Sequence, residues 1–173
     1  MLLILDKKIT GLLYSLVPHS KLFYLFFESL APTGVASFFW LIIAVFLLIF
    51  EEKKHKEFIF YFSLSIFFAF VFSNFILKPL FARPRPTTNL ICPKDYSFPS
   101  GHATFSFAAA SILSFFDKKR RFLYYLFALI IAYSRIYLGC HYFSDVFAGA
   151  LLGYIIGEVV KKIKLPTAPL RKT

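Results

Sequence analysis

The sequence predicts an all-α integral membrane protein, a single six-helix bundle spanning residues 1–173 with a candidate site at the outer ends of the helices. Composition is the first observation: 58% of the residues are hydrophobic, 25 are Phe, and the mean hydropathy is +0.68. The second is that these residues lie in blocks close to the ~20 residues that a helix needs to cross a bilayer. The chain contains no linker-like run or fixed repeat that would divide it into domains.

Five of the apolar blocks predict spanning helices without interruption. Each is bounded by charged or turn-forming residues, which makes the ends of the blocks easy to locate. The predicted spans are residues 34–50, 58–77, 101–116, 122–138 and 142–160.

A sixth block, residues 9–30, is interrupted by Pro18 and its polar neighbours His19 and Ser20. Two structures fit this pattern: one span kinked at the proline, or two short helices that lie partly in the membrane interface. We favour the kinked span, which completes a bundle of six.

The basic residues, which give a net charge of +11, border the apolar blocks and do not cover a polar face. That placement argues against a nucleic-acid partner and indicates membrane topology. With six crossings, the richest basic segments share one side, which the positive-inside rule makes cytoplasmic, both termini included. These segments are the N-terminal Lys7 and Lys8, then 51–57, 117–121 and 161–173. We therefore expect a cytoplasmic (inner) membrane protein whose other end faces the periplasm or exterior.

The remaining polar residues gather at that outer end, where topology does not account for them. Ionisable side chains inside a membrane cost roughly 2.5–3.5 kcal/mol each at a helix centre, so they mark functional sites. Lys78 and Arg85 lie at the outer end of the 58–77 span, where Pro79, Pro84 and Pro86 should end the helix. They are candidate anion ligands, although anchoring in the lipid headgroups would also explain them.

Residues Pro99 to His102 directly precede the next span. Ser100 is a suitable N-cap, and Gly101 lets the backbone approach a ligand closely. The free amides and positive dipole end of a helix start favour an anion. A plain helix cap beside an unrelated His102 is the alternative.

Arg135, His141 and Asp145 follow the fifth predicted span. If a helix begins near His141, the imidazole and the carboxylate of Asp145 stand four residues apart on one face. The carboxylate can then hold one ring nitrogen and leave the other free to attack or to carry a proton. A structural His–Asp pair joining two helices is the alternative.

Considered together, these residues suit phosphoryl transfer. Three cations and a capped helix start with a hydroxyl form a phosphate cradle, and two histidines divide the nucleophile and acid roles. The motif residues resemble the three-part signature of the type 2 phosphatidic acid phosphatase superfamily. Those residues are Lys78, Arg85, Pro86, Pro99, Ser100, Gly101, His102, Ser134, Arg135, His141 and Asp145.

The resemblance implies a role for each residue. His141 would be the nucleophile that forms a phosphohistidine, Asp145 would orient it, and His102 would protonate the leaving group. The phosphoryl oxygens would be held by Lys78, Arg85, Ser100, Gly101 and Arg135. It implies no metal and no cofactor, and the predicted spans argue against the superfamily's soluble vanadium haloperoxidases.

The resemblance therefore implies a membrane lipid phosphatase whose partners are its lipid phosphate substrate and the surrounding lipids, with no obligate protein partner. Undecaprenyl diphosphate, phosphatidylglycerophosphate, phosphatidate and the 1-phosphate of lipid A are the candidate substrates. A phosphotransferase would use the same residues. An anion transporter would use the cations but would leave the two histidines unexplained.

Several further residues have predicted roles. The two cysteines, Cys92 and Cys140, both face outward, where disulfides can form, and one hypothesis is that they are bonded or close together and pin the outer loop over the site. Asp95 should be a solvated loop residue, and Arg83 is an extra cation that could join the phosphate site. Close helix packing should explain the four-residue spacing of Gly149, Gly153 and Gly157.

Overall fold

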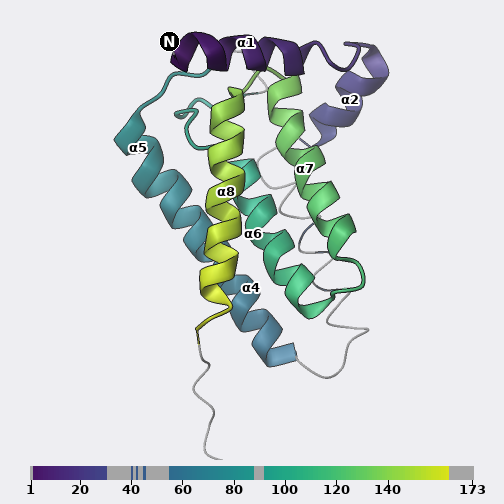
Figure 1. Cartoon of the computed structure of the whole chain (residues 1–173), viewed down its shortest axis with the longest axis vertical. Coiled ribbons are helices and arrows are strands. Elements are labelled where there is room, and N and C mark those ends of the chain that lie inside the picture. Colours follow the sequence, from purple (N-terminus) through teal and green to yellow (C-terminus); the bar gives the residue numbers. More distant parts are fainter. Residues whose placement is uncertain are drawn as a thin grey trace, which may run out of the picture.

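A computed structural model describes residues 2–30, 40, 42, 45, 55–87 and 92–163 (Figure 1). Every regular element in these ranges is helical. In chain order they are α1 (Leu2–Tyr14), α2 (Lys21–Ser29), α4 (His55–Phe70), the π-helix η1 (Val71–Leu77), α5 (Lys78–Phe81), α6 (Gly101–Phe116), α7 (Arg121–Tyr137) and α8 (Phe143–Val160). The predicted all-α class is confirmed within these residues.

The elements α4, η1 and α5 form one continuous helical stretch, His55–Phe81. Its part Glu57–Phe81, of 25 residues, is a candidate membrane span. It extends past residue 77 and past Pro79, contrary to the predicted bound, and it ends at Phe81, before Pro84 and Pro86. The helix widens into η1 and then resumes as α5, and Pro79 lies in the first turn of α5. A proline is tolerated there because a first-turn residue needs no amide donor.

Among the residues that the structure describes, two helical stretches are long and apolar enough to cross a membrane: Glu57–Phe81 and Phe143–Val160. At 1.5 Å per residue, the first is about 38 Å long and the second about 27 Å, close to the thickness of the hydrocarbon layer. Their outward faces carry exposed large apolar side chains, among them Phe67, Phe75, Phe147 and Leu151. Lipid tails, unlike water, accept such a surface without cost, so these helices belong to a membrane protein.

Helix α6 lies at the centre of the bundle and packs against α4, α7 and α8. The approach to α8 is very close, because a Cβ atom added at Gly153 would lie 2.1 Å from the Thr104 carbonyl oxygen. Gly149 and Gly157 meet the same helix, at Ser100 and Ser111. The predicted packing role of the three glycines is confirmed. The close contact between α6 and α8 fixes the starts of these two helices relative to each other.

Residues 9–30 do not form one helix. They contribute to two separate short helices, α1 and α2, joined by a turn around Pro18. Helix α1 lies across the end of the bundle where α8 begins (Figure 1), and the Phe143 amide donates to Thr10 Oγ1 at 2.9 Å. The favoured single kinked helix is therefore wrong, and two short helices are present, as in the alternative. Pro18 and the polar residues beside it allow the sharp change of direction.

This arrangement also corrects the predicted position of the N-terminal segment. Lys7 and Lys8 were expected opposite the candidate site, but α1 lies at the same end as the start of α8. The loop 117–120 and the end of α8 lie at the other end (Figure 1).

The predicted span 34–50 lies outside the described residues except for Trp40, Ile42 and Val45. The indole of Trp40 is buried and donates to Ser106 Oγ on α6 at 3.1 Å. Parts of the basic segments 51–57 and 161–173 also lie outside the described residues.

Candidate active site

Three segments that are distant in sequence meet at the α1 end of the bundle. They are the chain that leaves α5, the loop that leads into α6, and the turn between α7 and α8 (Figure 1). All eight predicted site residues lie on these segments or at the helix ends beside them: Lys78, Arg85, Ser100, Gly101, His102, Arg135, His141 and Asp145.

His141 lies in the turn before α8 and is 2% exposed. Its Nε2 atom is 2.9 Å from the Arg85 guanidinium, which can only donate. The Nε2 atom must therefore be the acceptor, so a neutral His141 carries its proton on Nδ1. That proton faces Asp145, whose Oδ2 lies 3.6 Å from Nδ1, slightly beyond hydrogen-bond distance.

The pKa of His141 lies well below its ordinary value, at about 4. Burial is the main cause, and the positive charges of Arg85 and Arg135 act in the same direction, against the carboxylate of Asp145. At neutral pH the ring is therefore uncharged, with an unprotonated Nε2 atom.

Helix α8 begins at Phe143, close to the predicted start at 142, so His141 lies just before the helix and only Asp145 lies within it. The carboxylate of Asp145 accepts the Tyr142 amide at 2.9 Å, which caps the helix start. Capping starts the helix after Tyr142 and leaves His141 on the preceding turn.

The Asp145 carboxylate is completely buried and makes three kinds of contact. Its Oδ2 atom receives the Tyr142 amide and faces His141, while Oδ1 accepts a 2.6 Å hydrogen bond from Arg83. The Asp145 carbonyl oxygen also accepts the Ser100 amide at 2.9 Å. Asp145 therefore joins the α8 turn to the start of α6 through its backbone carbonyl, while its carboxylate contacts Tyr142, His141 and Arg83.

Ser100 precedes α6 at the N-cap position, as predicted, but its side chain makes no capping hydrogen bond. The Oγ atom is buried and has no hydrogen-bond partner within the described residues. A buried hydroxyl without a partner is costly unless a ligand satisfies it. Gly101 follows, and a Cβ atom there would lie 3.8 Å from the Lys78 ammonium.

The three predicted cations are buried side chains, with Arg135 fully inaccessible and Lys78 at 7% exposed. Arg135 Nη1 lies 3.5 Å from His102 Nε2, which brings the second histidine to the same cluster. Lys78 donates to Asn74 Oδ1 at 3.0 Å and also to the Asp95 carboxylate.

Asp95 is an exposed loop residue, as the sequence suggests, but it also pairs with two of the predicted cations. Its carboxylate bridges two of the predicted phosphate ligands, contacting Lys78 through Oδ2 and Arg85 through Oδ1. Burial by itself would raise the pKa of Asp95, but the hydrogen bonds from Lys78 and Arg85 outweigh it and hold the pKa below 3.8. No local pattern distinguishes this carboxylate from any other in a polar loop.

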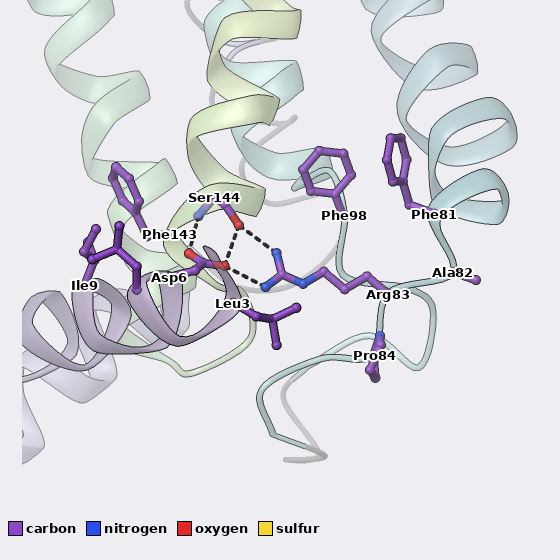
Figure 2. A pocket seen from close by; sticks show the side chains of 11 residues that line it. Leu3, Asp6, Ile9, Phe81, Ala82, Arg83, Pro84, Phe98, Phe143 and Ser144 are labelled. Atoms are coloured by element: carbon purple, nitrogen blue, oxygen red, sulfur yellow. Dashed lines mark hydrogen bonds and ion pairs between the residues drawn. The ribbon is translucent and has the colours of Figure 1, made fainter. Parts of the chain in front are cut away.

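Arg83 also has a role that differs from the expected one. Its guanidinium contacts Asp145, Ser144 and Asp6 at 2.6, 2.7 and 2.6 Å, and it lies 4.0 Å from the centre of the Tyr142 ring. Figure 2 shows it between α1 and the start of α8. In this position the Arg83 guanidinium is engaged by Asp145, Ser144 and Asp6, and it holds the Asp145 carboxylate in place.

Asp6 is the residue at this end that sequence reasoning missed. Its carboxylate accepts hydrogen bonds from the amide and hydroxyl of Ser144, at 3.0 and 2.6 Å, as well as from Arg83. The available signal was a single carboxylate after five apolar residues at the start of the chain. Such a charge needs a partner when it is buried.

The disulfide between Cys92 and Cys140 is confirmed, with the two Cα atoms 5.3 Å apart. It ties the loop before α6 to the residue next to His141. The Cys140 carbonyl oxygen also accepts a 2.9 Å hydrogen bond from Arg85. Cys140 therefore binds both the loop, through the disulfide, and the cation cluster, through Arg85.

Comparison with known proteins agrees with this site. The sequence profile of the PAP2 superfamily matches residues 58–166, which contain all eight predicted site residues. The undecaprenyl-diphosphatase of Sulfolobus acidocaldarius is 37% identical over 100 residues, covering 57% of this chain and 45% of that protein. The lipid A 4'-phosphatase of Porphyromonas gingivalis is 29% identical over 148 residues, covering 75% of this chain and 63% of that protein.

The chain thus spans between 45% and 63% of the length of these two curated relatives. The crystal structure of Aquifex aeolicus LpxE superimposes with a TM-score of 0.72 at 32% identity, covering 92% of this chain and 96% of that one. The predicted resemblance is confirmed: the matched profile extends over more than half of the sequence, and this chain belongs to the PAP2 superfamily.

Proposed function

We propose that the protein is a membrane lipid phosphatase in which His141 is the nucleophile of a two-step, metal-independent hydrolysis. The observation that carries the proposal is the state of the His141 ring. Its unprotonated Nε2 atom faces Arg85, and its Nδ1 proton faces Asp145. A neutral imidazole with an unprotonated Nε2 atom beside a cluster of cations suits attack on the phosphorus of an anionic ester once Arg85 releases that atom.

In the first step, His141 Nε2 bonds to phosphorus while the phosphorus–oxygen bond to the lipid breaks. His102 gives its proton to the departing oxygen, and Asp145 stabilises the positive charge on the phosphorylated ring. In the second step His102 takes a proton from water, whose oxygen bonds to phosphorus as the nitrogen–phosphorus bond breaks. Inorganic phosphate and the free enzyme result.

The phosphoryl oxygens would lie among the buried donors around His141. Those donors are Lys78, Arg85, Ser100 Oγ, the Gly101 amide and Arg135, which together offset the charge that develops in phosphoryl transfer. The buried, unpartnered Ser100 hydroxyl is the group that most needs such a ligand.

A lipid substrate is supported by the surroundings of the site as well as by the relatives. A pocket of about 640 Å³ lies between α1, α5 and α8 beside Arg83 (Figure 2). Its walls are mostly apolar, as an alkyl or prenyl chain requires: Leu3, Leu5, Ile9, Phe81, Phe98 and Phe143. We propose a lipid phosphomonoester or diphosphate as the substrate class, with undecaprenyl diphosphate, phosphatidylglycerophosphate, phosphatidate and lipid A 1-phosphate as the candidates to be assayed.

We further propose that the site faces the outside of the cytoplasmic membrane. The loop between α6 and α7 contains Lys118, Lys119, Arg120 and Arg121, at the end of the bundle opposite the site. Positive loops stay on the cytoplasmic side, which supports this orientation.

The test uses purified protein in detergent and measures phosphate released from those four lipids. We expect release from at least one lipid, its loss in His141→Ala and His102→Ala, and its retention in His19→Ala, a histidine outside the cluster. Release should continue when a chelator is present. Full activity in either cluster variant would refute the assigned roles, and no release from any lipid would refute the substrate class.

A further inference from the structure

The Arg85 guanidinium has no hydrogen-bond donor to spare. It carries five N–H groups, and each has an acceptor. Nε donates to the Asp95 carbonyl oxygen, Nη1 contacts the Cys140 carbonyl oxygen and His141 Nε2, and Nη2 contacts Asp95 Oδ1 and the Tyr96 carbonyl oxygen. A phosphate can therefore be held by Arg85 only if at least one of these contacts breaks.

Lys78 is occupied by the same carboxylate. Its ammonium group contacts Asp95 Oδ2 and Asn74 Oδ1. The two oxygens of Asp95 thus engage two of the cations assigned to the phosphate, one oxygen on each. A phosphate or phosphonate group would present oxygens to these donors in the same way.

The Arg85 contacts also cover the nucleophile. Nη1 donates to the Nε2 lone pair of His141, and a lone pair engaged in a hydrogen bond is unavailable for attack. Because Asp95 holds Arg85 through Nε and Nη2, the same carboxylate residue keeps the guanidinium in its covering position.

Of the three side chains Asp95, Lys78 and Arg85, that of Asp95 is the most easily displaced. It is 45% exposed, whereas the side chains of Lys78 and Arg85 are 8% and 6% exposed. When Asp95 moves away, water can solvate its exposed carboxylate at little cost in free energy. The buried Lys78 and Arg85 side chains, by contrast, then need another anion in place of Asp95.

The loop that carries Asp95 keeps it close to the cations after release. The loop is fastened on one side by the Cys92–Cys140 disulfide and on the other by Ser97, whose amide and hydroxyl donate to the carbonyl oxygens of Arg83 and Pro84 at 2.9 and 3.1 Å. A tethered carboxylate has a high effective concentration, so it competes with free anions in solution.

We propose that Asp95 is a built-in competitor of the substrate phosphate, occupying Lys78 and Arg85 in the free enzyme and holding Arg85 over the His141 nucleophile. The incoming phosphate displaces the carboxylate, draws Arg85 onto its own oxygens and exposes Nε2. The inference rests on the proposed function only for the assignment of Lys78 and Arg85 as phosphate ligands. It makes Asp95 a determinant of anion affinity.

The test is direct binding of inorganic phosphate, measured by titration calorimetry on the purified protein in detergent with the disulfide intact. Asp95→Asn removes the competing charge and keeps the shape of the side chain. We expect this variant to bind phosphate at least fivefold more tightly than the wild-type protein. Inhibition of lipid hydrolysis by phosphate should strengthen by a similar factor, and the KM for the lipid should fall.

Glu28→Gln is the matched control, because it changes the net charge equally on α2, away from the cluster. It should leave phosphate affinity within twofold of wild type. Asp95→Ser is a second neutral variant in case Asp95→Asn does not accumulate as folded protein. Unchanged or weaker phosphate binding in the folded neutral variants would overturn the proposal and would make Asp95 a positioning residue for the cations.

The two proposals fail separately in this design. Tighter phosphate binding in Asp95→Asn without lipid hydrolysis by the wild-type protein would retain the competitor and reject the enzyme. Lipid hydrolysis by the wild-type protein with unchanged phosphate binding in Asp95→Asn would support the enzyme and reject the role of Asp95 as a competitor.

Discussion

Asp6 and Arg83, 77 residues apart in the chain, are joined by a 2.6 Å ion pair between α1 and the segment that follows α5. The same guanidinium contacts Asp145 Oδ1, so two carboxylates share one cation. Asp6 lies outside the residues that match the family profile, which begin at 58. A helix outside that region is thus connected to the carboxylate that faces His141.

Asp6→Asn should lower kcat about tenfold with little change in KM. The substitution removes the charge that draws Arg83 toward α1, so the guanidinium is free to shift on the Asp145 carboxylate and disturb the orientation of His141. The substrate phosphate does not contact Asp6, which is why KM should change little. Steady-state kinetics on a lipid phosphate would measure both constants.

Lys7→Gln is the control for Asp6→Asn, because it alters an exposed charge on the same turn of α1 and should leave both constants unchanged. Asp6→Glu, which retains the charge, should recover part of kcat. If kcat per folded molecule in Asp6→Asn equals that of wild type, the connection through Arg83 has no role in catalysis.

Gly153→Ala should destabilise the bundle by about 1–3 kcal/mol or more. The added methyl group would lie 2.1 Å from the Thr104 carbonyl oxygen and 2.9 Å from the Ala108 amide nitrogen, so α6 and α8 must separate. The thermal midpoint in detergent would measure the loss. Gly11→Ala is the matched control, since nothing lies within 4 Å of a Cβ atom there, and its midpoint should be unchanged or higher.

Ala82→Gly should stabilise the protein by about 1 kcal/mol. Ala82 ends α5 in the left-handed conformation, with φ 44° and ψ 34°, where a Cβ atom is unfavourable and glycine is not. Ala148→Gly, at a helical position of α8, should have the opposite sign because glycine weakens helix interiors. A lower midpoint for Ala82→Gly would show that the methyl group contributes packing that outweighs the backbone cost.

Acid should destabilise the wild-type protein more than His141→Gln. The pKa of His141 is about 4 in the folded protein and 6.5 when the chain is unfolded, so between these values only the unfolded chain binds the proton. Stability therefore falls as the pH drops through this range, by about 2 kcal/mol at pH 5.

Thermal midpoints at pH 7 and pH 5 would measure this effect, with an expected difference between the two proteins of roughly 4–8 °C. The pKa values of Asp6 and Asp95 lie below 3.8, so their stabilising contributions are retained at pH 5 and lost only in stronger acid. An equal fall of the thermal midpoint between pH 7 and pH 5 in both proteins would mean that the pKa of His141 in the folded protein is close to its ordinary value.

Local sequence was enough to locate α6, α7 and α8 to within about two residues. Their boundaries depend on apolar run length and on nearby turn residues, which are local properties. It was not enough for residues 9–30 or for the end of α5, where a proline permits more than one outcome. At Pro18 the chain turns, whereas at Pro79 a π-helical segment lets the helix continue.

The sequence by itself predicted the membrane class and the eight candidate site residues, because these follow from composition and from residues at fixed spacing, and it placed both cysteines at one end of the bundle. Only the tertiary structure decided which charges pair. Asp95 binds Lys78 and Arg85, and Asp6 binds Arg83 and Ser144. These partners are far apart in the chain, and the close packing of α6 against α8 and of α1 across the bundle end brings them together. No local pattern encodes such contacts, because electrostatic pairing depends on distance in space and not on distance along the chain.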